Sequence, residues 1–322
     1  MSLHPCVAAV RLAVRRCLAG LPSPGVVVVA CSGGADSLAL LAAAVFEGRP
    51  AGFAVIGVTV DHGLQEGSAE QAQRVVAQMA ALGAAETVSA RVSVDSPGLG
   101  PEAAARQARY AVLDEIAPRF AAAAVLLGHT RDDQAETVLL GLARGSGGRS
   151  LAGMRRSFAG YRRPLLDVSR DDTVTACRVQ GIEPWTDPQN ADPSYLRVRV
   201  RSRVLPVLET ELGPGVAATL ARTAEQLRTD MEHLDALAEA ALADLGEPLA
   251  VARLTALPDA VRRRVLRLAA VRAGAPPAEL FYEHVLGMDA LLTDWHGQKW
   301  IDLPGHLRAV RREGLLLFDP AS

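Results

Sequence analysis

This sequence is poor in lysine, aromatic residues and cysteine. Lys299 is the only lysine, although lysine and arginine together number 34, so arginine carries nearly all the positive charge. Aromatic residues make up 4% of the chain and hydrophobic residues 49%, so alanine, valine and leucine must form the core. The four cysteines form no C-x-x-C pair and no metal-ligand spacing, which suits reduced thiols and predicts a cytoplasmic protein.

Long apolar runs are also missing. No apolar stretch reaches the roughly 18 residues that span a bilayer, so we expect no membrane contact. Residues 1–21 carry Arg11, Arg15 and Arg16 at helical spacing and lack the apolar centre of a signal peptide, which predicts a surface helix.

Two common nucleotide-binding motifs are absent. A Walker loop needs a lysine where this chain has Asp36, and Gly33-Gly34 lacks the spacing of the dinucleotide fingerprint. Residues 26–37 instead read V-V-V-V-A-C-S-G-G-A-D-S, a buried strand, a glycine turn and the start of a helix. Backbone N–H groups of such a turn approach phosphate oxygens closely, so the turn predicts a phosphate site.

Strands and helices alternate through the first 143 residues. Residues 53–60, 86–94 and 123–127 read as strands, and residues 68–82, 101–116 and 132–143 read as helices, with Ser68 an N-cap. This alternation predicts an α/β fold with a doubly wound parallel sheet. Polar clusters at 31–37, 61–63 and 128–133 each follow a strand, so we expect a ligand crevice at that sheet edge.

The segment after residue 213 has a different character. Gly213-Pro-Gly215 breaks the chain, and the length of 322 residues suggests two domains, which we place at 1–213 and 214–322. We expect the second, smaller domain to be mainly helical, with a hairpin after Trp300. Its predicted helices span residues 216–245, 257–272 and 278–292.

Several motifs resemble those of one family. S-G-G-x-D-S after a first strand resembles the pyrophosphatase (PP) loop of the ATP pyrophosphatases, which have an adenine nucleotide alpha hydrolase-like fold. Between residues 22 and 210, in family order, the chain carries D-H-G-L, E-A-A-A-R-Q-A-R-Y, G-H-T-R-D-D-Q-A-E-T, A-R-G-S-G, R-P-L-L, W-T-D-P-Q-N and Y-L-R. Together they resemble the tRNA(Ile)-lysidine synthetases. The chain departs from the family pattern at Gln65, Thr130 and Val198.

The resemblance implies a two-step ligation that uses ATP and Mg²⁺. ATP would adenylate the C2 oxygen of the wobble cytidine in a tRNA(Ile) with a CAU anticodon, with release of pyrophosphate. Free lysine would then displace AMP through its ε-amine. The N-terminal domain would bind ATP and catalyse the reaction, and the C-terminal domain would bind tRNA.

Site residues follow from the motifs and from the chemistry of their side chains. The expected catalytic residues are Asp36, His129, Asp132, Asp133 and Glu136, and Asp36 and Asp133 would hold the metal. The expected ATP-binding residues are Ser32, Gly33, Gly34, Ala35, Asp36, Ser37, Asp61, His62, Arg106 and Arg109. The expected tRNA-binding residues are Arg197, Arg201 and Arg203, joined by a basic side of the C-terminal domain at Arg262, Arg263, Arg264, Arg267 and Arg272.

Other interpretations of these features stay open. Acidic residues are common at helix starts, and Arg106 and Arg109 could form ordinary surface salt bridges. A tRNA thiolation enzyme of the same superfamily, or a nucleotide-binding regulator without catalysis, would also keep the glycine turn. A homodimer is compatible with the sequence, which does not decide the oligomeric state.

Overall fold

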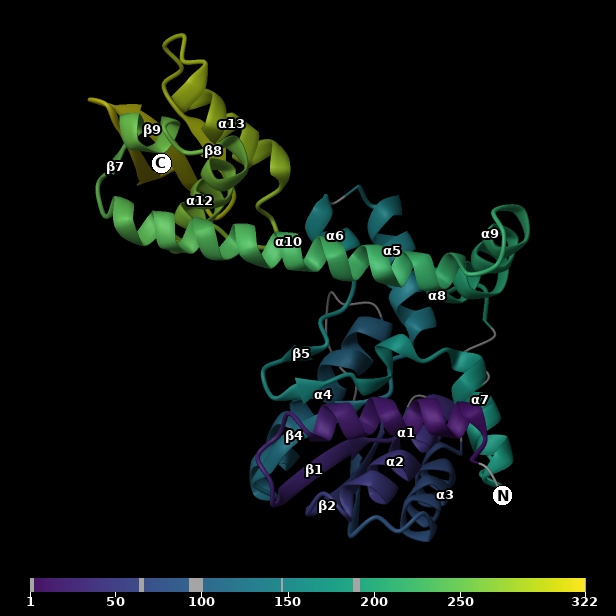
Figure 1. Ribbon diagram of the computed structural model, residues 1–322. Helices are drawn as coiled ribbons and strands as arrows, with labels where there is room; N and C mark the ends of the chain where they lie inside the picture. The colour runs from purple at the N-terminus through teal and green to yellow at the C-terminus, as the bar shows by residue number, and fades with distance from the viewer. Residues whose placement is uncertain (1–2, 64–66, 93–100, 146, 188–191, 322) are drawn as a thin grey trace. The chain divides into compact units, whose positions relative to one another are not determined.

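The computed structural model describes residues 3–63, 67–92, 101–145, 147–187 and 192–321. The chain divides into two compact units, Met1–Glu225 and Gln226–Ser322, and each is described by itself (Figure 1). Within the described residues, no helix is both long enough and apolar enough to cross a membrane.

A six-stranded sheet forms the centre of the first unit. The strand order is β3-β2-β1-β4-β6-β5. The first four strands in the chain, β1 (Gly25–Ala30), β2 (Phe53–Asp61), β3 (Glu86–Arg91) and β4 (Ala122–Leu127), pair in parallel. The hairpin β5 (Ser157–Phe158) and β6 (Tyr161–Arg162) extends the edge, where only β5 runs antiparallel to its neighbour. The predicted doubly wound sheet is therefore confirmed, although β3 ends at Arg91 rather than near residue 94.

Helices cover both faces of this sheet. The helices of the first unit up to residue 179 are α1 (Pro5–Leu18), α2 (Ala35–Gly48), α3 (Ser68–Ala81), α4 (Pro101–Arg119), α5 (Arg131–Ala143), α6 (Gly148–Leu151), a 3₁₀ turn η1 (Pro164–Asp167) and α7 (Arg170–Val179). The prediction of Ser68 as an N-cap is wrong, because Gly67 takes that position with φ +80°, a value that glycine tolerates better than serine.

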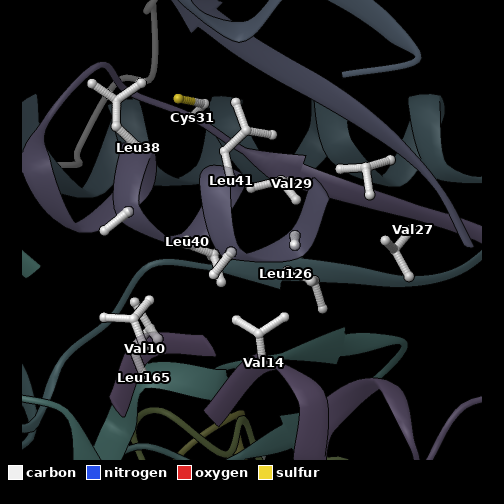
Figure 2. Close-up of a cluster of buried hydrophobic side chains, with 14 of the residues drawn as sticks. Val10, Val14, Val27, Val29, Cys31, Leu38, Leu40, Leu41, Leu126 and Leu165 are labelled. Atoms are coloured by element: carbon white, nitrogen blue, oxygen red, sulfur yellow. The ribbon is translucent and has the colours of Figure 1, made fainter. Parts of the chain in front are cut away.

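Alanine, valine and leucine form the core, as the composition predicts. On one face of the sheet, Val27 and Val29 of β1 pack with Leu38 and Leu41 of α2 (Figure 2). The predicted N-terminal surface helix belongs to this cluster, because α1 buries a stripe of four apolar residues. These residues are Val7, Val10, Val14 and Leu18. On the other face, Val28 and Ile56 pack with Leu113 of α4.

Short helices follow α7 and pack on α5. They are α8 (Leu196–Arg199), the π-helical turn η3 (Val200–Val204) and α9 (Leu205–Glu211). Val200 and Leu205 are buried against Ala135 of α5. The long helix α10 (Val216–Leu245) begins after the predicted boundary at residue 213, but the two units divide inside it, after Glu225.

The second unit combines helices with an antiparallel sheet. Its helices are α11 (Val251–Thr255), α12 (Asp259–Arg272) and α13 (Tyr282–Thr293). The expected hairpin is β9 (Leu307–Arg312) with β10 (Leu315–Pro320). It is widened to four strands by β7 (Leu249–Ala250) and β8 (Ile301–Leu303), in the order β7-β10-β9-β8. Two residues of β7 and three of β8 are too few for a periodic pattern to reveal them in sequence.

Candidate active site

The turn after β1 presents backbone N–H groups at the start of α2. Gly33 has φ +83°, and a Cβ atom there would lie 2.6 Å from Val75 Cγ2, so both conformation and packing require glycine. Inside the turn, Ser32 N–H donates to Ser37 Oγ (3.2 Å), and this hydroxyl donates to Gly34 O (2.9 Å). The first N–H groups of α2 have no partner within the helix, so this end can receive an anion.

Two other segments of the chain contact this turn. Trp185 N–H donates to Gly33 O (2.8 Å), which brings the chain after α7 beside the loop. A Cβ atom on Gly128 would lie 3.1 Å from Ser37 N, so the end of β4 meets the start of α2 closely. The predicted convergence of the first and fourth strand ends is therefore confirmed.

Asp36 lies at the first turn of α2, largely covered by α7. Thr173 Oγ1 donates to Asp36 Oδ1, and Arg170 Nε lies 3.6 Å from Asp36 Oδ2. Burial raises the pKa of Asp36 to about 6, although the Thr173 hydrogen bond and the Arg170 charge act in the opposite direction. Ionised Asp36 is thus held in a costly environment that a further cation would relieve.

Asp133 caps its own helix. Asp133 Oδ2 accepts from Thr130 N–H (2.8 Å) and Thr130 Oγ1 (3.0 Å), which forms a capping box at the start of α5. Asp133 Oδ1 lies 2.7 Å from Arg170 Nη2. Burial alone would raise the pKa of Asp133, but the Arg170 charge and the Thr130 N–H hold it below its usual value.

Glu136 is completely buried beneath a group of arginines. Its carboxylate lies 2.6 Å from Arg201 Nε, 3.2 Å from Arg170 Nη1 and 3.4 Å from Arg197 Nε. The three arginines balance the three carboxylates Asp36, Asp133 and Glu136 in charge. Within the part of the chain that the structure describes, no three His, Cys, Asp or Glu side chains form a metal-binding group.

Arg170 is the most connected of the site residues that the sequence analysis missed, which also include Arg163 and Thr173. It contacts Asp36, Asp133 and Glu136 through its side chain, and its N–H donates to Asp132 Oδ2 (2.8 Å). The signal was present, because Ser169 and Asp172 form a capping box that starts α7 at Arg170. Nothing in that local signal says which helix faces α7.

His129 lies at the end of β4 beside Arg163. Arg163 Nε donates to His129 Nδ1 (3.3 Å), so the neutral imidazole carries its proton on Nε2. Burial and the nearby Arg163 charge lower the pKa of His129 to about 3, outweighing the effect of Asp133. Arg163 is itself buried, with Nη1 on Arg155 O (2.6 Å) and its guanidinium over the Phe158 ring. His129 is therefore neutral at neutral pH, with a proton on Nε2.

Asp61 and His62 follow β2. Asp61 is buried, accepts from Gly63 N–H (2.9 Å) and lies 3.6 Å from Arg91 Nε. His62 Nδ1 is buried and has no hydrogen-bond partner among the described residues. Burial, with the charge of nearby Arg109, lowers the pKa of His62.

Arg106 and Arg109 are exposed on α4. Arg106 Nη2 donates to the Tyr110 hydroxyl (3.2 Å), and its guanidinium lies over the Tyr110 ring. Neither arginine belongs to an ion pair among the described residues, so the ordinary salt-bridge interpretation finds no support there.

The three arginines expected to bind tRNA differ in their surroundings. Arg197 and Arg201 pair with Glu136, whereas Arg203 is exposed. Two departures from the family pattern have structural roles, because Thr130 caps α5 and Val198 is buried. Gln65 and Asn190 lie outside the described residues.

The expected basic side of the second unit needs correction. Arg262 is buried and forms an ion pair with Asp289, with Nε 2.6 Å from Oδ1. Arg263 Nε lies 2.8 Å from the other oxygen of Asp289. Arg264 pairs with Asp235 (3.0 Å), and Arg267 donates to Pro277 O (2.8 Å). These arginines mainly hold helices together, and Arg272 remains exposed.

Comparisons with known proteins agree with this geometry. Residues 13–208 match a PP-loop domain, and residues 249–317 match a TilS substrate binding domain. The tRNA(Ile)-lysidine synthase of Thermobifida fusca is 53% identical over 97% of both chains, and that of Streptomyces coelicolor is 51% identical over 98% of this chain and 99% of its own. The chain belongs to the tRNA(Ile)-lysidine synthase family.

A solved structure supports the fold assignment alone. The U34-tRNA thiolase NcsA of Methanococcus maripaludis, with its [4Fe-4S] cluster, superposes with a TM-score of 0.58 at 18% identity. The match covers 69% of this chain and 79% of the thiolase. In this member of the tRNA(Ile)-lysidine synthase family, the residues around the loop come from β1, β2, β4, α5 and α7 of the first unit.

Proposed function

We propose that this protein is an ATP-dependent ligase that joins free lysine to C2 of the wobble cytidine of tRNA(Ile) with a CAU anticodon. The observation that carries the proposal is the meeting of a PP loop with the carboxylates of α5 in a chain of this family. The first unit would carry out catalysis and the second would bind tRNA. We place the reaction in the cytoplasm, in keeping with four free cysteines.

In the first step, the turn from Ser32 to Ser37 would hold the β and γ phosphates through backbone N–H groups. The C2 oxygen of cytidine would attack the α phosphorus, and pyrophosphate would leave. His129, neutral with its proton on Nε2, is suited to donate a hydrogen bond to an oxyanion. The unpartnered Nδ1 of His62 favours a contact with the nucleoside part of ATP.

Asp36 suits a Mg²⁺ ion better than Asp133 does. Asp36 is near a phosphate-binding turn, and its raised pKa reflects a carboxylate that a cation would stabilise. Both oxygens of Asp133 already accept donors, so Asp133 would join only after Arg170 released it. Bound Mg²⁺ would neutralise phosphate charge as pyrophosphate leaves.

In the second step, the lysine ε-nitrogen would form a bond to C2, and the bond from C2 to the AMP oxygen would break. The ammonium must first lose a proton, because its ordinary pKa is about 10.4. Asp132 is the best placed acceptor of this proton, since it is partly exposed and accepts from the N–H of Arg170, whose side chain contacts Asp36 and Asp133. Glu136 is less suitable because three arginines already surround it.

A direct test combines the protein with a CAU-anticodon tRNA(Ile), ATP and radiolabelled lysine. Label in the RNA, with one AMP and one pyrophosphate per lysine, supports the proposal. Transfer of labelled sulfur in place of lysine would support the thiolation alternative. ATP binding with neither product would support a regulator. The described site uses residues of one chain, so a homodimer is not required for the test.

A further inference from the structure

The second unit contains a cavity that the proposed chemistry does not use. Its volume is about 450 Å³, within the range of about 300–1,000 Å³ typical of small-ligand sites. The segment after α13 and the strands β9 and β10 line it. Its lining includes Trp295, Lys299, Trp300, Arg308, Arg311 and Asp319.

Positive charge dominates this lining. Lys299, Arg308, Arg311 and Arg312 contribute four cations, against the single carboxylate of Asp319. Arg312 lies 3.2 Å from Asp319, so that pair is balanced, and Arg308 is paired with Asp302 at 2.9 Å. Lys299 and Arg311 have no carboxylate partner among the described residues, which leaves an attraction for anions.

Two tryptophans of the cavity remain open to solvent. Trp295 is 48% exposed and Trp300 is 42% exposed, in a chain with three tryptophans in total. Exposed tryptophans that line a charged cavity are unusual in a folded domain unless a partner covers them.

Arginines and backbone contacts hold both rings in position. The Arg311 guanidinium lies 4.8 Å from the Trp295 ring centroid, and that of Arg308 lies 4.6 Å from the Trp300 ring. Arg311 Nη1 also donates to Leu291 O (2.9 Å), and Trp295 Nε1 donates to Gln298 O (3.1 Å). These contacts favour one arrangement of the two rings before any ligand arrives, which lowers the entropic cost of binding.

We propose that this cavity binds one unpaired nucleotide of the tRNA substrate, with the base stacked on Trp295 or Trp300 and the phosphate beside Lys299 and Arg311. Aromatic faces next to cations are the chemistry of single-stranded nucleic acid binding. Val310 is the only aliphatic side chain in the lining apart from proline, so an apolar peptide would find few contacts. The inference rests on the proposed function for the identity of the RNA.

The test measures the affinity of full-length variants for a CAU-anticodon tRNA(Ile), a single-stranded octanucleotide and a blunt RNA duplex. Trp295→Ala and Trp300→Ala should each weaken tRNA and octanucleotide binding by about 5- to 100-fold, the range for one stacked base. Duplex binding should change less than twofold. Trp300→Phe keeps an aromatic face and should restore most of the affinity.

Two further variants separate this effect from misfolding. Phe281→Ala removes a 63% exposed aromatic side chain of the same unit outside the cavity and should leave affinity unchanged. Lys299→Gln removes no ring and should reduce the salt slope of tRNA binding by about one. Thermal melting should show both tryptophan variants folded.

Two outcomes would overturn the inference. One is wild-type tRNA affinity in both tryptophan variants, in a preparation that forms lysidine. The other is that the tryptophan variants lose binding of a protein partner while their affinity for RNA stays at the wild-type value. If the wild-type protein forms no lysidine, the proposed function fails, and the octanucleotide titration alone decides whether the cavity binds RNA.

Discussion

Asp36 is a carboxylate whose pKa is raised by burial in the fold. Its ordinary pKa is 3.8, and burial raises the pKa to about 6 in the folded protein. A raised native pKa favours the protonated form, so this contribution to stability is full below about pH 4 and is lost as pH rises through 6. A bound Mg²⁺ ion would offset that cost, because a cation stabilises the ionised form.

Asp36→Asn should reduce pyrophosphate release by about 100-fold or more, because a neutral amide holds Mg²⁺ much less strongly than a carboxylate does. In the wild type, release at limiting Mg²⁺ should rise with pH through about 6, as Asp36 loses its proton. Initial rates of pyrophosphate release from pH 5 to 8 test both expectations. Near wild-type turnover with unchanged Mg²⁺ dependence would refute the metal role.

The same variant should stabilise the protein without ligand. Asparagine resembles the protonated carboxyl group, so the free energy of unfolding at pH 8 should rise by up to about 3 kcal/mol, and the difference should vanish below pH 4. Urea unfolding at both pH values measures it. A less stable variant at pH 8 would mean that the attraction between Arg170 and ionised Asp36 exceeds the cost of burying that carboxylate.

Asp132→Asn should separate the two steps. Adenylation, followed as pyrophosphate release, should stay within about tenfold of wild type, whereas lysine transfer should fall about 10²- to 10⁴-fold, as expected for a lost general base. Raising the pH should partly restore transfer, because more free amine is present. A variant that fails in adenylation but transfers lysine from preformed adenylate would move Asp132 to the ATP site.

At the scale of elements, α7 supplies a positive charge that offsets the repulsion between carboxylates of α2 and α5. Each of those helices has a carboxylate in its first turn, Asp36 in α2 and Asp133 in α5, and Glu136 adds another one turn later in α5. Arg170, the first residue of α7, contacts all three carboxylates. Without it, three negative charges would converge in a poorly solvated space.

Arg170→Met should therefore destabilise the protein by about 3–5 kcal/mol, the usual cost of breaking a buried ion pair from one side. Chemical denaturation measures this loss. Arg178→Met is the matched control, since Arg178 lies on the same helix and is exposed, and its effect should stay within about 0.5 kcal/mol. Equal effects of the two substitutions would show that the ion-pair network contributes little to stability.

At the scale of the whole molecule, the helix α10 connects the two units of the chain. Ending the chain at Glu225 should weaken tRNA binding at least tenfold while leaving ATP affinity within about twofold, because the PP-loop domain lies in the first unit. Titrations with labelled tRNA and with an ATP analogue test this, with circular dichroism as a check on folding. Equal loss of both affinities would mean that the second unit only supports the first.

The sequence by itself determined the order of elements and the sheet edge that carries the site. Runs such as the four valines at residues 26–29, bounded by turn residues, predict buried strands, and backbone conformation requires glycine at Gly33. Because parallel strands present their carboxyl ends together, the strand pattern alone predicts that Asp36, Asp61 and His129 lie at one edge. Motif order alone was sufficient to name the family.

Only the tertiary structure decided which charges meet. In the sequence, Arg197 and Arg201 look like part of a basic RNA-binding stripe. In the structure they pair with Glu136 on α5, a helix much earlier in the chain. Arg262 likewise pairs with Asp289 in the interior. Coulomb energy depends on distance and burial, which a linear pattern does not contain, so ion pairs between helices appear only once the helices are packed.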